Sequence, residues 1–201
     1  MLKLQQIYES SITFTNANHP DDLKWLNNRL TLVTSFDDFF EEYCYCVVAS
    51  GFRGSTAGKL APLLAAQKGN FEKSIAIFKN KQKIKAICSC YSNLSTNYQS
   101  VSKNWKVPSD LQSLPFIGSV TCFHLARNIG LCSSVKPDLH LVKIIEKLFQ
   151  QSDNEFVQLK IKELADKNKS PHGVVDFNLW IYLSHNEGQT MKCCGGKIRL
   201  R

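Results

Sequence analysis

The sequence contains no long run of apolar residues and no secretory type of N-terminus. Its first residues, MLKLQQIYESSITF, do not place a basic stretch before a long apolar one, as a signal peptide would. Nowhere do apolar residues follow one another over the length needed to cross a bilayer. We therefore expect a cytoplasmic protein, nucleoid-associated in a bacterium, with no membrane partner.

The sequence also lacks the polar excess of disordered chains and the cysteine spacing of a standard zinc site. Hydrophobic residues make up 43% and charged residues 21%, which is ordinary for a globular protein. The eight cysteines include two Cys-x-Cys pairs and one adjacent pair: Cys44 with Cys46, Cys88 with Cys90, and Cys193 with Cys194. We expect free thiols, with Cys44 and Cys88 on apolar helical faces as small buried hydrophobes.

Acidic residues are in the minority. Twenty-five Lys and Arg against 17 Asp and Glu give a net charge of +8, and the pI is about 9.1. Such a balance favours an anionic partner, with nucleic acid first and an acidic membrane surface or acidic protein behind it. Charge alone identifies no partner, because many basic proteins bind none of these.

The alternation typical of strands is missing, and apolar residues recur with helical spacing almost throughout. The 201 residues fit one domain, or two small helical lobes sharing a cleft. Helix starts are expected at Asp21 or Asp22, at Ser35 with Asp38 as a capping box, and at Asn70, with further helices over 154–167 and 176–184. We expect an all-α fold and a mobile basic tail, MKCCGGKIRLR.

Two glycine-bearing segments interrupt the helical pattern. VVASGFRGST, at 47–56, predicts an exposed loop. LPFIGSV, at 114–120, ends a short helix that begins at Pro108 and starts another that ends at Gly130. Such a turn exposes N–H groups at the positive end of the second helix dipole, where a phosphate can bind. The ordinary alternative is a turn that only joins two packed helices.

A lone carboxylate, Asp138, follows Pro137 at the start of a further helix. The positive end of the helix dipole favours negative charge at this place. Taken by itself, Asp138 is an ordinary N-terminal helix cap.

The turn and the carboxylate together form a recognisable string, SLPFIGSVTCFHLARNIGLCSSVKPDLHLVKI. This string resembles the helix-hairpin-helix and Gly/Pro/Asp-loop signature of the HhH-GPD superfamily of DNA glycosylases. The resemblance is close over 109–148 and looser from about residue 36, through FEEYCYCVVASGFRGSTAGKL. It implies two helical lobes flanking a DNA-binding cleft, with the helix-hairpin-helix motif at 109–130. One lobe would comprise 31–134, and the other 1–30 with 135–201.

The resemblance assigns roles by position. Asp138 matches the family's catalytic aspartate, and lysines such as Lys136 and Lys143 would help to hold the DNA strand. A DNA phosphate would be bound by the hairpin residues, through the amides of Phe116, Gly118 and Val120 with Ser119 and Thr121 beside them. The carbonyls of Gln112, Leu114 and Ile117 could hold a Na⁺ or K⁺ that bridges to this phosphate. Gly51, Phe52 and Arg53 fall where the family inserts side chains into the gap left by an extruded nucleotide.

Four departures from the family pattern carry information. Phe116 stands at the position of the first hairpin glycine, and Gly51 replaces a common wedge glutamine, which leaves Phe52 or Arg53 as the wedge. Val120 stands where strand-cutting members carry a lysine, so the resemblance implies a monofunctional enzyme that leaves an abasic site. The four spaced cysteines of iron–sulfur relatives are absent, so no such cluster and no other cofactor is expected.

The expected reaction follows from charge. Breaking an N-glycosidic bond builds positive charge on the sugar, which a fixed carboxylate stabilises while it orients the attacking water. The target base must first leave the stack of double-stranded DNA. Alkylated purines, mispaired uracil or thymine, oxidised guanine and hypermodified phage cytosines all remain open, so the role is DNA repair or antiviral defence.

Two other functions remain open beside a monomeric glycosylase. One is a non-catalytic helix-hairpin-helix protein that only binds DNA, and the other is a generic helical interaction domain. We expect the lysines of 79–85 to form a solvated face and not a DNA contact. We likewise expect His140 to be solvated and not to contact the DNA backbone. The basic tail leaves both readings open.

Overall fold

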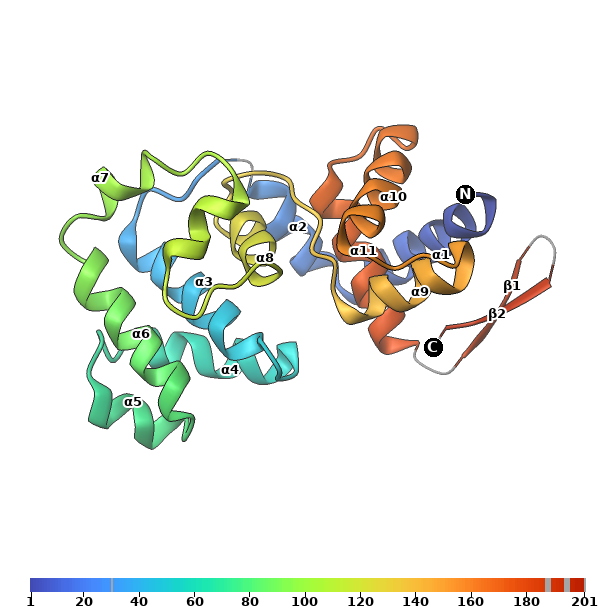
Figure 1. Cartoon of the computed structure of the whole chain (residues 1–201). Helices are drawn as coiled ribbons and strands as arrows, with labels where there is room; N and C mark the ends of the chain where they lie inside the picture. The colour runs from blue at the N-terminus through green and yellow to red at the C-terminus, as the bar shows by residue number, and fades with distance from the viewer. Residues whose placement is uncertain (30, 187–188, 194–195, 201) are drawn as a thin grey trace. The chain divides into compact units, whose positions relative to one another are not determined.

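The structure, a computed structural model, describes residues 1–29, 31–186, 189–193 and 196–200, without the side chains of 191–196. The chain divides into two compact units (Figure 1). Arg29–Cys132 form one, called the central unit below. Met1–Asn28 and Ser133–Arg201 form the other, called the split unit.

Helices joined by loops make up the central unit, and its described residues contain no strand. Its elements are α3 (Phe36–Ala49), α4 (Gly54–Ala65), α5 (Phe71–Ile77), α6 (Lys81–Leu94), α7 (Tyr98–Ser102), the 3₁₀ helix η1 (Pro108–Ser113) and α8 (Thr121–Asn128). The Asn70 cap is confirmed, since its side chain accepts from the Lys73 N–H. Of the two bonds of the expected capping box, the described residues show one, in which the Ser35 hydroxyl accepts from the Asp38 N–H. Helix α3 packs against α4, α6 and α8, so it forms the centre of this unit.

The core of the central unit is rich in aromatic rings. Phe39 is fully buried and lies 4.9 Å from the ring of Tyr98 and 5.3 Å from that of Trp105, between ring centroids. Helix α8 ends at Asn128, two residues before the expected Gly130, and Gly130 itself has a φ of +73°. A Cβ at this glycine would lie 2.2 Å from the Thr31 carbonyl oxygen, so only glycine allows the close approach.

The split unit combines both ends of the chain. Its elements are α1 (Leu2–Asn18), α2 (Pro20–Asn28), α9 (Leu139–Phe149), α10 (Asn154–Lys167), α11 (His172–His185), β1 (Thr190–Cys193) and β2 (Gly196–Arg199). The core joins Leu4 and Ile7 of α1 to apolar residues of α9, α10 and α11. Helix α10 has the expected bounds, whereas α11 begins four residues before the expected start at 176.

The all-α class is confirmed, with one correction at the C-terminus. The expectation of no strands was wrong, because β1 and β2 pair as an antiparallel hairpin with Thr190 opposite Arg199. The expectation of a mobile tail does not fit its packing, because Ile198 and Leu200 are buried in the core of the split unit. Cys194 lies outside the described residues. No helix among the described residues is long and apolar enough to span a membrane.

Candidate functional site

The helix-hairpin-helix segment consists of η1, the turn at 114–120 and α8. Asp110 organises its start, because its side chain accepts hydrogen bonds from the N–H groups of Lys106 and Val107. These bonds lower the pKa of Asp110. Leu111, Leu114 and Ile117 are buried in the core of the central unit. The Tyr43 hydroxyl of α3 donates to the Pro115 carbonyl over 2.6 Å, which fixes the turn to the core.

Phe116 adopts the left-handed conformation that a glycine would favour at this position of the turn. Its φ is +65°, and 43% of the residue is exposed. A left-handed conformation costs a non-glycine residue about 1–2 kcal/mol. The hairpin therefore keeps a strained turn although its first glycine is replaced, and the Phe116 ring is held at the surface.

The turn presents backbone donors that the protein itself does not use. Among the described residues, no hydrogen bond engages the N–H groups of Gly118, Ser119 or Val120, and no side chain caps α8. Gly118 is exposed, and a Cβ there would meet no atom within 4 Å. Its carbonyl accepts from the Cys122 N–H over 3.0 Å, which orders the first turn of α8. This arrangement of donors can bind an anion such as a phosphate.

The three carbonyls expected to hold a monovalent cation lie in the same segment. The Leu114 carbonyl accepts from the Ile117 N–H over 3.2 Å and keeps a second lone pair. Gln112 is exposed, and its side chain donates to the Cys122 sulfur over 3.7 Å. Neutral backbone oxygens of this kind are the ligands that hard cations such as Na⁺ or K⁺ accept.

The loop between α3 and α4 carries the candidate wedge. Gly51 has a φ of +85°, and Gly51, Phe52 and Arg53 are all exposed. Phe52 is 46% exposed, and its ring packs edge-on against Phe78 with 5.3 Å between centroids. Arg53 is the N-terminal flanking residue of α4. Of the two wedge candidates, Phe52 is therefore the one that presents a large apolar side chain at the surface.

Lys83 joins this loop to the hairpin, a role that the sequence analysis missed. The residue is 3% exposed, and its ammonium donates to the carbonyls of Val48, over 2.9 Å, and Ser50. The same ammonium lies 4.7 Å from the centroid of the Phe52 ring and 5.5 Å from that of Phe116. Burial lowers the pKa of Lys83.

The expectation of a solvated face for the lysines of 79–85 was therefore wrong for Lys83. The burial of Lys83 could have been predicted from the helical spacing of apolar residues in α6. Lys83 shares one helical face with the buried residues Ile87, Cys90 and Leu94.

Asp138 is the N-cap of α9 in the split unit. Its Oδ1 accepts from the N–H groups of His140, over 2.9 Å, and Leu141, over 3.1 Å. Among the described residues nothing donates to Oδ2, and the side chain is half-buried. The cap and the catalytic assignment are therefore compatible, since the helix holds one oxygen and leaves the other available. Lys136, half-buried, accepts from the Asp138 N–H through its carbonyl over 2.8 Å.

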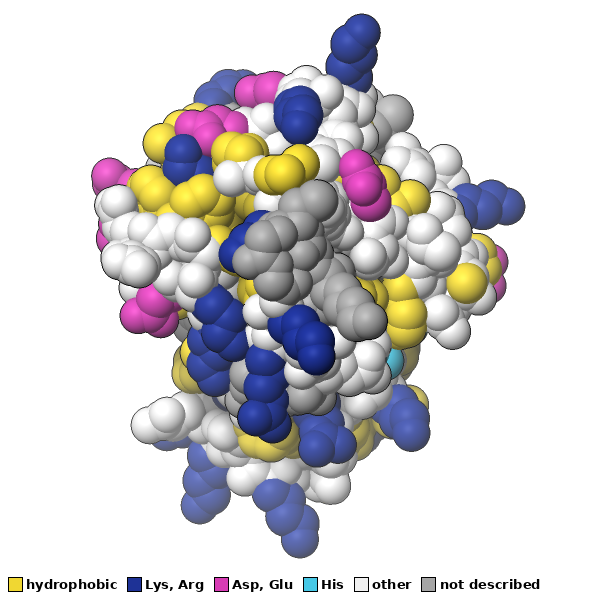
Figure 2. Space-filling model, turned by 90° about the vertical axis from the view of Figure 1, so that its right-hand side faces the viewer, with side chains coloured by type: hydrophobic (Ala, Val, Ile, Leu, Met, Phe, Trp, Pro, Cys, Tyr) yellow, Lys and Arg dark blue, Asp and Glu magenta, His cyan; other side chains and the backbone are white. Residues whose placement is uncertain are grey.

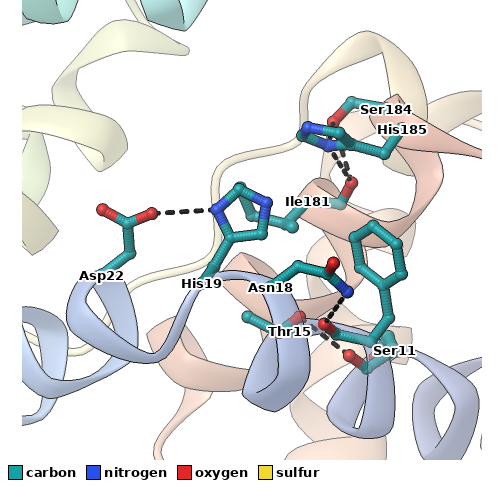
Figure 3. Close-up of polar contacts among 9 residues, drawn as sticks. Ser11, Thr15, Asn18, His19, Asp22, Ile181, Ser184 and His185 are labelled. Carbon is teal, nitrogen blue, oxygen red and sulfur yellow. Dashed lines mark hydrogen bonds and ion pairs between the residues drawn. The ribbon is translucent and has the colours of Figure 1, made fainter.

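A second group of polar side chains lies where α1 ends beside α11 (Figure 3). His19 pairs with Asp22 at 3.1 Å, and its ring centroid lies 5.0 Å from that of His185. His185 contacts the Ile181 carbonyl of its own helix through Nδ1 over 3.0 Å. This cluster ties two helices together and is not a metal site, because no group of three or more His, Cys, Asp or Glu among the described residues could hold a metal ion.

The cysteines of the central unit form no disulfide among the described residues. Cys44, Cys46, Cys90 and Cys122 are buried, and Cys88 is half-buried. Burial raises the pKa of the Cys44, Cys88 and Cys90 thiols. Cys44, Cys46 and Cys90 lie in the apolar core of the central unit and Cys88 packs against it, so the two Cys-x-Cys pairs pack as small apolar side chains.

Comparison with known proteins finds solved structures of similar fold but low sequence identity. No protein-family model and no curated protein matches the chain. The structure is similar to the 8-oxoguanine DNA glycosylase of Thermotoga maritima, with a TM-score of 0.70 and 14% identity over 88% of this chain and 95% of that one. It is also similar to the Methanocaldococcus jannaschii 8-oxoguanine glycosylase/lyase in complex with a 15mer DNA containing 8-oxoguanine. That match has a TM-score of 0.68 and 14% identity over 96% of this chain and all of the other.

Both similar proteins belong to the HhH-GPD superfamily. The resemblance predicted from LPFIGSV and VKPDLHLVKI is therefore confirmed at the level of the fold.

Proposed function

We propose that this protein is a monofunctional DNA glycosylase. It would flip a modified or damaged base out of double-stranded DNA in the cytoplasm, as a monomer, and hydrolyse the N-glycosidic bond to leave an abasic site. The observation that carries the proposal is Asp138, whose carboxylate is oriented by α9 through Oδ1 while Oδ2 accepts nothing from the described residues. This carboxylate occurs in a fold shared with structures of DNA glycosylases.

The chemistry assigned to Asp138 is electrostatic and hydrolytic. As the bond between sugar and base breaks, positive charge develops on the sugar ring, and a carboxylate beside C1′ stabilises that charge. Oδ2 can also accept a proton from the water that attacks C1′. The two hydrogen bonds to Oδ1 restrict the carboxylate to one orientation before the reaction, so little reorganisation is needed.

The hairpin would bind the DNA strand and take no part in the reaction itself. The N–H groups at 118–120 would bind a DNA phosphate at the N-terminus of α8, with Phe116 and Thr121 beside them. The carbonyls of Gln112, Leu114 and Ile117 fit a Na⁺ or K⁺, which would add positive charge next to that phosphate. Lys136 would contribute a further positive charge near Asp138.

The loop at 50–53 would keep the duplex open. Flipping a base costs a few kcal/mol, and an apolar ring that fills the vacated space reduces that cost. The exposure of Phe52 and its contact with Phe78 support this residue as the wedge. Arg53, exposed beside it, would contact the DNA backbone.

No strand cleavage is expected from this chain. The Methanocaldococcus jannaschii protein is described as a glycosylase/lyase. The resemblance to the family implies a lysine amine at the position of Val120 in members that cut the strand. Valine has no amine and forms no Schiff base with the sugar. Borohydride should therefore trap no covalent complex between the protein and DNA, whereas a trapped complex would contradict the monofunctional assignment.

A panel of modified duplexes tests the proposal directly. The panel would carry alkylated purines, mispaired uracil and thymine, oxidised guanine, and genomic DNA of phages with hypermodified cytosines. Alkali should cleave at least one of these after incubation with the protein, because abasic sites are alkali-labile. Release from a lesion would assign a repair enzyme, and release from a phage base an antiviral one. Binding of duplex DNA without abasic product on any substrate would contradict the proposal and favour the non-catalytic DNA-binding protein.

A further inference from the structure

The C-terminal hairpin has a cationic outer face. Residues 189–201 contain two lysines and two arginines and no acidic residue. In β2, Lys197 and Arg199 are exposed whereas Ile198 is buried, as is Leu200 directly after the strand. Because successive side chains of a strand point to opposite faces, the apolar residues point inward and the cations outward.

The hairpin is anchored on α9, the helix that Asp138 caps. Lys147 of α9 donates from its ammonium to the Arg199 carbonyl over 2.6 Å. Ile198 and Leu200 share the apolar core with Ile144 of α9 and Leu183 of α11. The cations of β2 are therefore held in a fixed place beside α9, although they belong to the end of the chain.

Helix α9 adds its own cations to this face. A small hollow has an apolar floor of Ile144, Leu183 and Leu200 and is bordered by His140, Lys143 and Lys147. Lys143 and Lys147 lie one helical turn apart, so their side chains share one face of α9. Figure 2 shows Lys and Arg side chains gathered on the side of the molecule that carries this hairpin.

The lysines of this surface have no carboxylate partner in the part of the chain that the structure describes. Among the described residues, none of Lys143, Lys147 and Lys197 forms an ion pair with a carboxylate. Like charges held close together repel one another, and a polyanion laid across them removes that repulsion. Ammonium and guanidinium groups gathered on one face suit a phosphodiester backbone, which is bound through charge and without reading of the bases.

We infer that the outer face of β2 and the adjoining face of α9, defined by Lys143, Lys147, Lys197 and Arg199, bind the phosphate backbone of DNA. This inference rests on the proposed action on DNA and adds a contact in the split unit, on the helix that carries Asp138. The C-terminal hairpin is then a DNA-binding element in its own right, separate from the helix-hairpin-helix turn of the central unit.

The salt dependence of binding tests this inference. The test variant combines Lys143→Gln with Lys197→Gln and keeps Lys147, which holds the hairpin. The control variant combines Lys24→Gln on α2 with Lys162→Gln on α10, two exposed lysines of the same unit. Affinity for an unmodified duplex would be measured against salt concentration, with thermal melting as a check that each variant folds.

Each lost phosphate contact lowers the slope of log affinity against log salt by about 0.9. The test variant should therefore lose about 1.8 units of slope relative to the wild type, and the control variant much less. Equal slopes for the two variants would overturn the inference, as would loss of binding to acidic phospholipid vesicles in the test variant with an unchanged DNA slope. If the wild-type protein bound no DNA at all, the proposed function itself would fail. If base release depended on Asp138 and the test variant kept the salt slope of the wild type, only the DNA contact of this surface would be rejected. The proposed function would stand.

Discussion

Substitution of Gly118 can distinguish a turn that binds phosphate from a turn that only joins two helices. Its φ is not left-handed, and a Cβ would meet no protein atom within 4 Å, so the fold does not require glycine here. A phosphate bound to the neighbouring N–H groups would need the space that a methyl group fills. Gly118→Ala should therefore leave the melting temperature nearly unchanged and weaken binding of duplex DNA by about tenfold, or about 1.4 kcal/mol.

Gly58→Ala is the matched control for this substitution. Gly58 lies inside α4, and a Cβ there also meets nothing within 4 Å. Alanine at this position should raise stability by up to about 1 kcal/mol and leave DNA affinity unchanged. If Gly118→Ala behaved in the same way as Gly58→Ala, the hairpin would be only a structural turn.

Glu42 gives the protein a predictable dependence of stability on pH. Burial raises the pKa of Glu42 from 4.5 to about 7, although a hydrogen bond from Asn128 and the charge of Arg29 oppose the shift. Between these two values the folded protein binds more protons than the unfolded chain, so stability falls as the pH rises. The stabilisation is complete below about pH 4.5 and lost above about pH 7.

Glu42→Gln should remove this fall in stability. A neutral amide accepts the Asn128 hydrogen bond without the cost of burying a charge, so the variant should be more stable than the wild type at pH 8 by about 1–3 kcal/mol. Urea unfolding at pH 5 and pH 8 measures the difference. Glu41→Gln, at an exposed neighbour, is the control and should change little at either pH. A wild-type protein that gained stability between pH 5 and pH 8 relative to Glu42→Gln would contradict the account.

At the scale of residues, the sequence identified side chains whose placement depends on local signals. Asp138 was found because it follows Pro137 at a helix start, and Gly118 because it lies in a turn between two periodic segments. Lys83 and Glu42 were not found, because a charged residue is buried only through tertiary contacts. Their partners, the Ser50 carbonyl and Asn128, lie 33 and 86 residues away in the sequence.

Among the elements, α6 connects the loop at 50–53 to the hairpin through Lys83. Lys83→Met removes the donor to the carbonyls of Val48 and Ser50 and the cation beneath Phe52 and Phe116. The loop should open more readily, so the amides of 50–53 should exchange with solvent faster than in the wild type. Base release should decrease more than DNA affinity, because a misplaced wedge impairs flipping while leaving phosphate contacts in place.

Lys85→Met is the control for this prediction, since Lys85 is exposed on the same helix. It removes the same charge without touching the loop, and both exchange and base release should match the wild type. Unchanged exchange at 50–53 in Lys83→Met would mean that Lys83 does not position the loop.

Elements with strong periodicity and clear caps could be predicted from the sequence, and others could not. Helix α10 begins after its Asp153 cap and has the predicted bounds of 154–167. Helix α1 was missed, because Ser11 and Thr15 occupy buried positions and blur its apolar face. In the structure both hydroxyls bond within the helix: that of Ser11 donates to the Tyr8 carbonyl. The Thr15 hydroxyl donates to the Ser11 carbonyl (Figure 3). The β-hairpin was missed because its alternation is limited to 197–200.

For the whole molecule, the prediction of the fold depended on a short stretch of sequence, at 109–148, and not on overall sequence identity. The similar solved structures are only 14% identical in sequence to this chain, although their TM-scores are 0.70 and 0.68. The turn at 114–120 and Asp138 are local patterns that can be recognised in the sequence of this chain without any overall identity to a known protein. The substrate was not predictable, because the lining of a base pocket depends on the relative placement of segments far apart in the sequence.

The central claim is that Asp138 carries out base release, and it is tested by comparing Asp138→Asn with Asp153→Asn on a substrate that the wild-type protein cleaves. Both aspartates are N-caps in the split unit, and asparagine caps a helix as well as aspartate does, so both variants should fold with wild-type stability. Single-turnover base release and affinity for the same duplex would be measured for each. Asp138→Asn should lose at least about 100-fold in rate with nearly unchanged affinity, while Asp153→Asn should keep both. A wild-type rate of base release in Asp138→Asn would contradict the account.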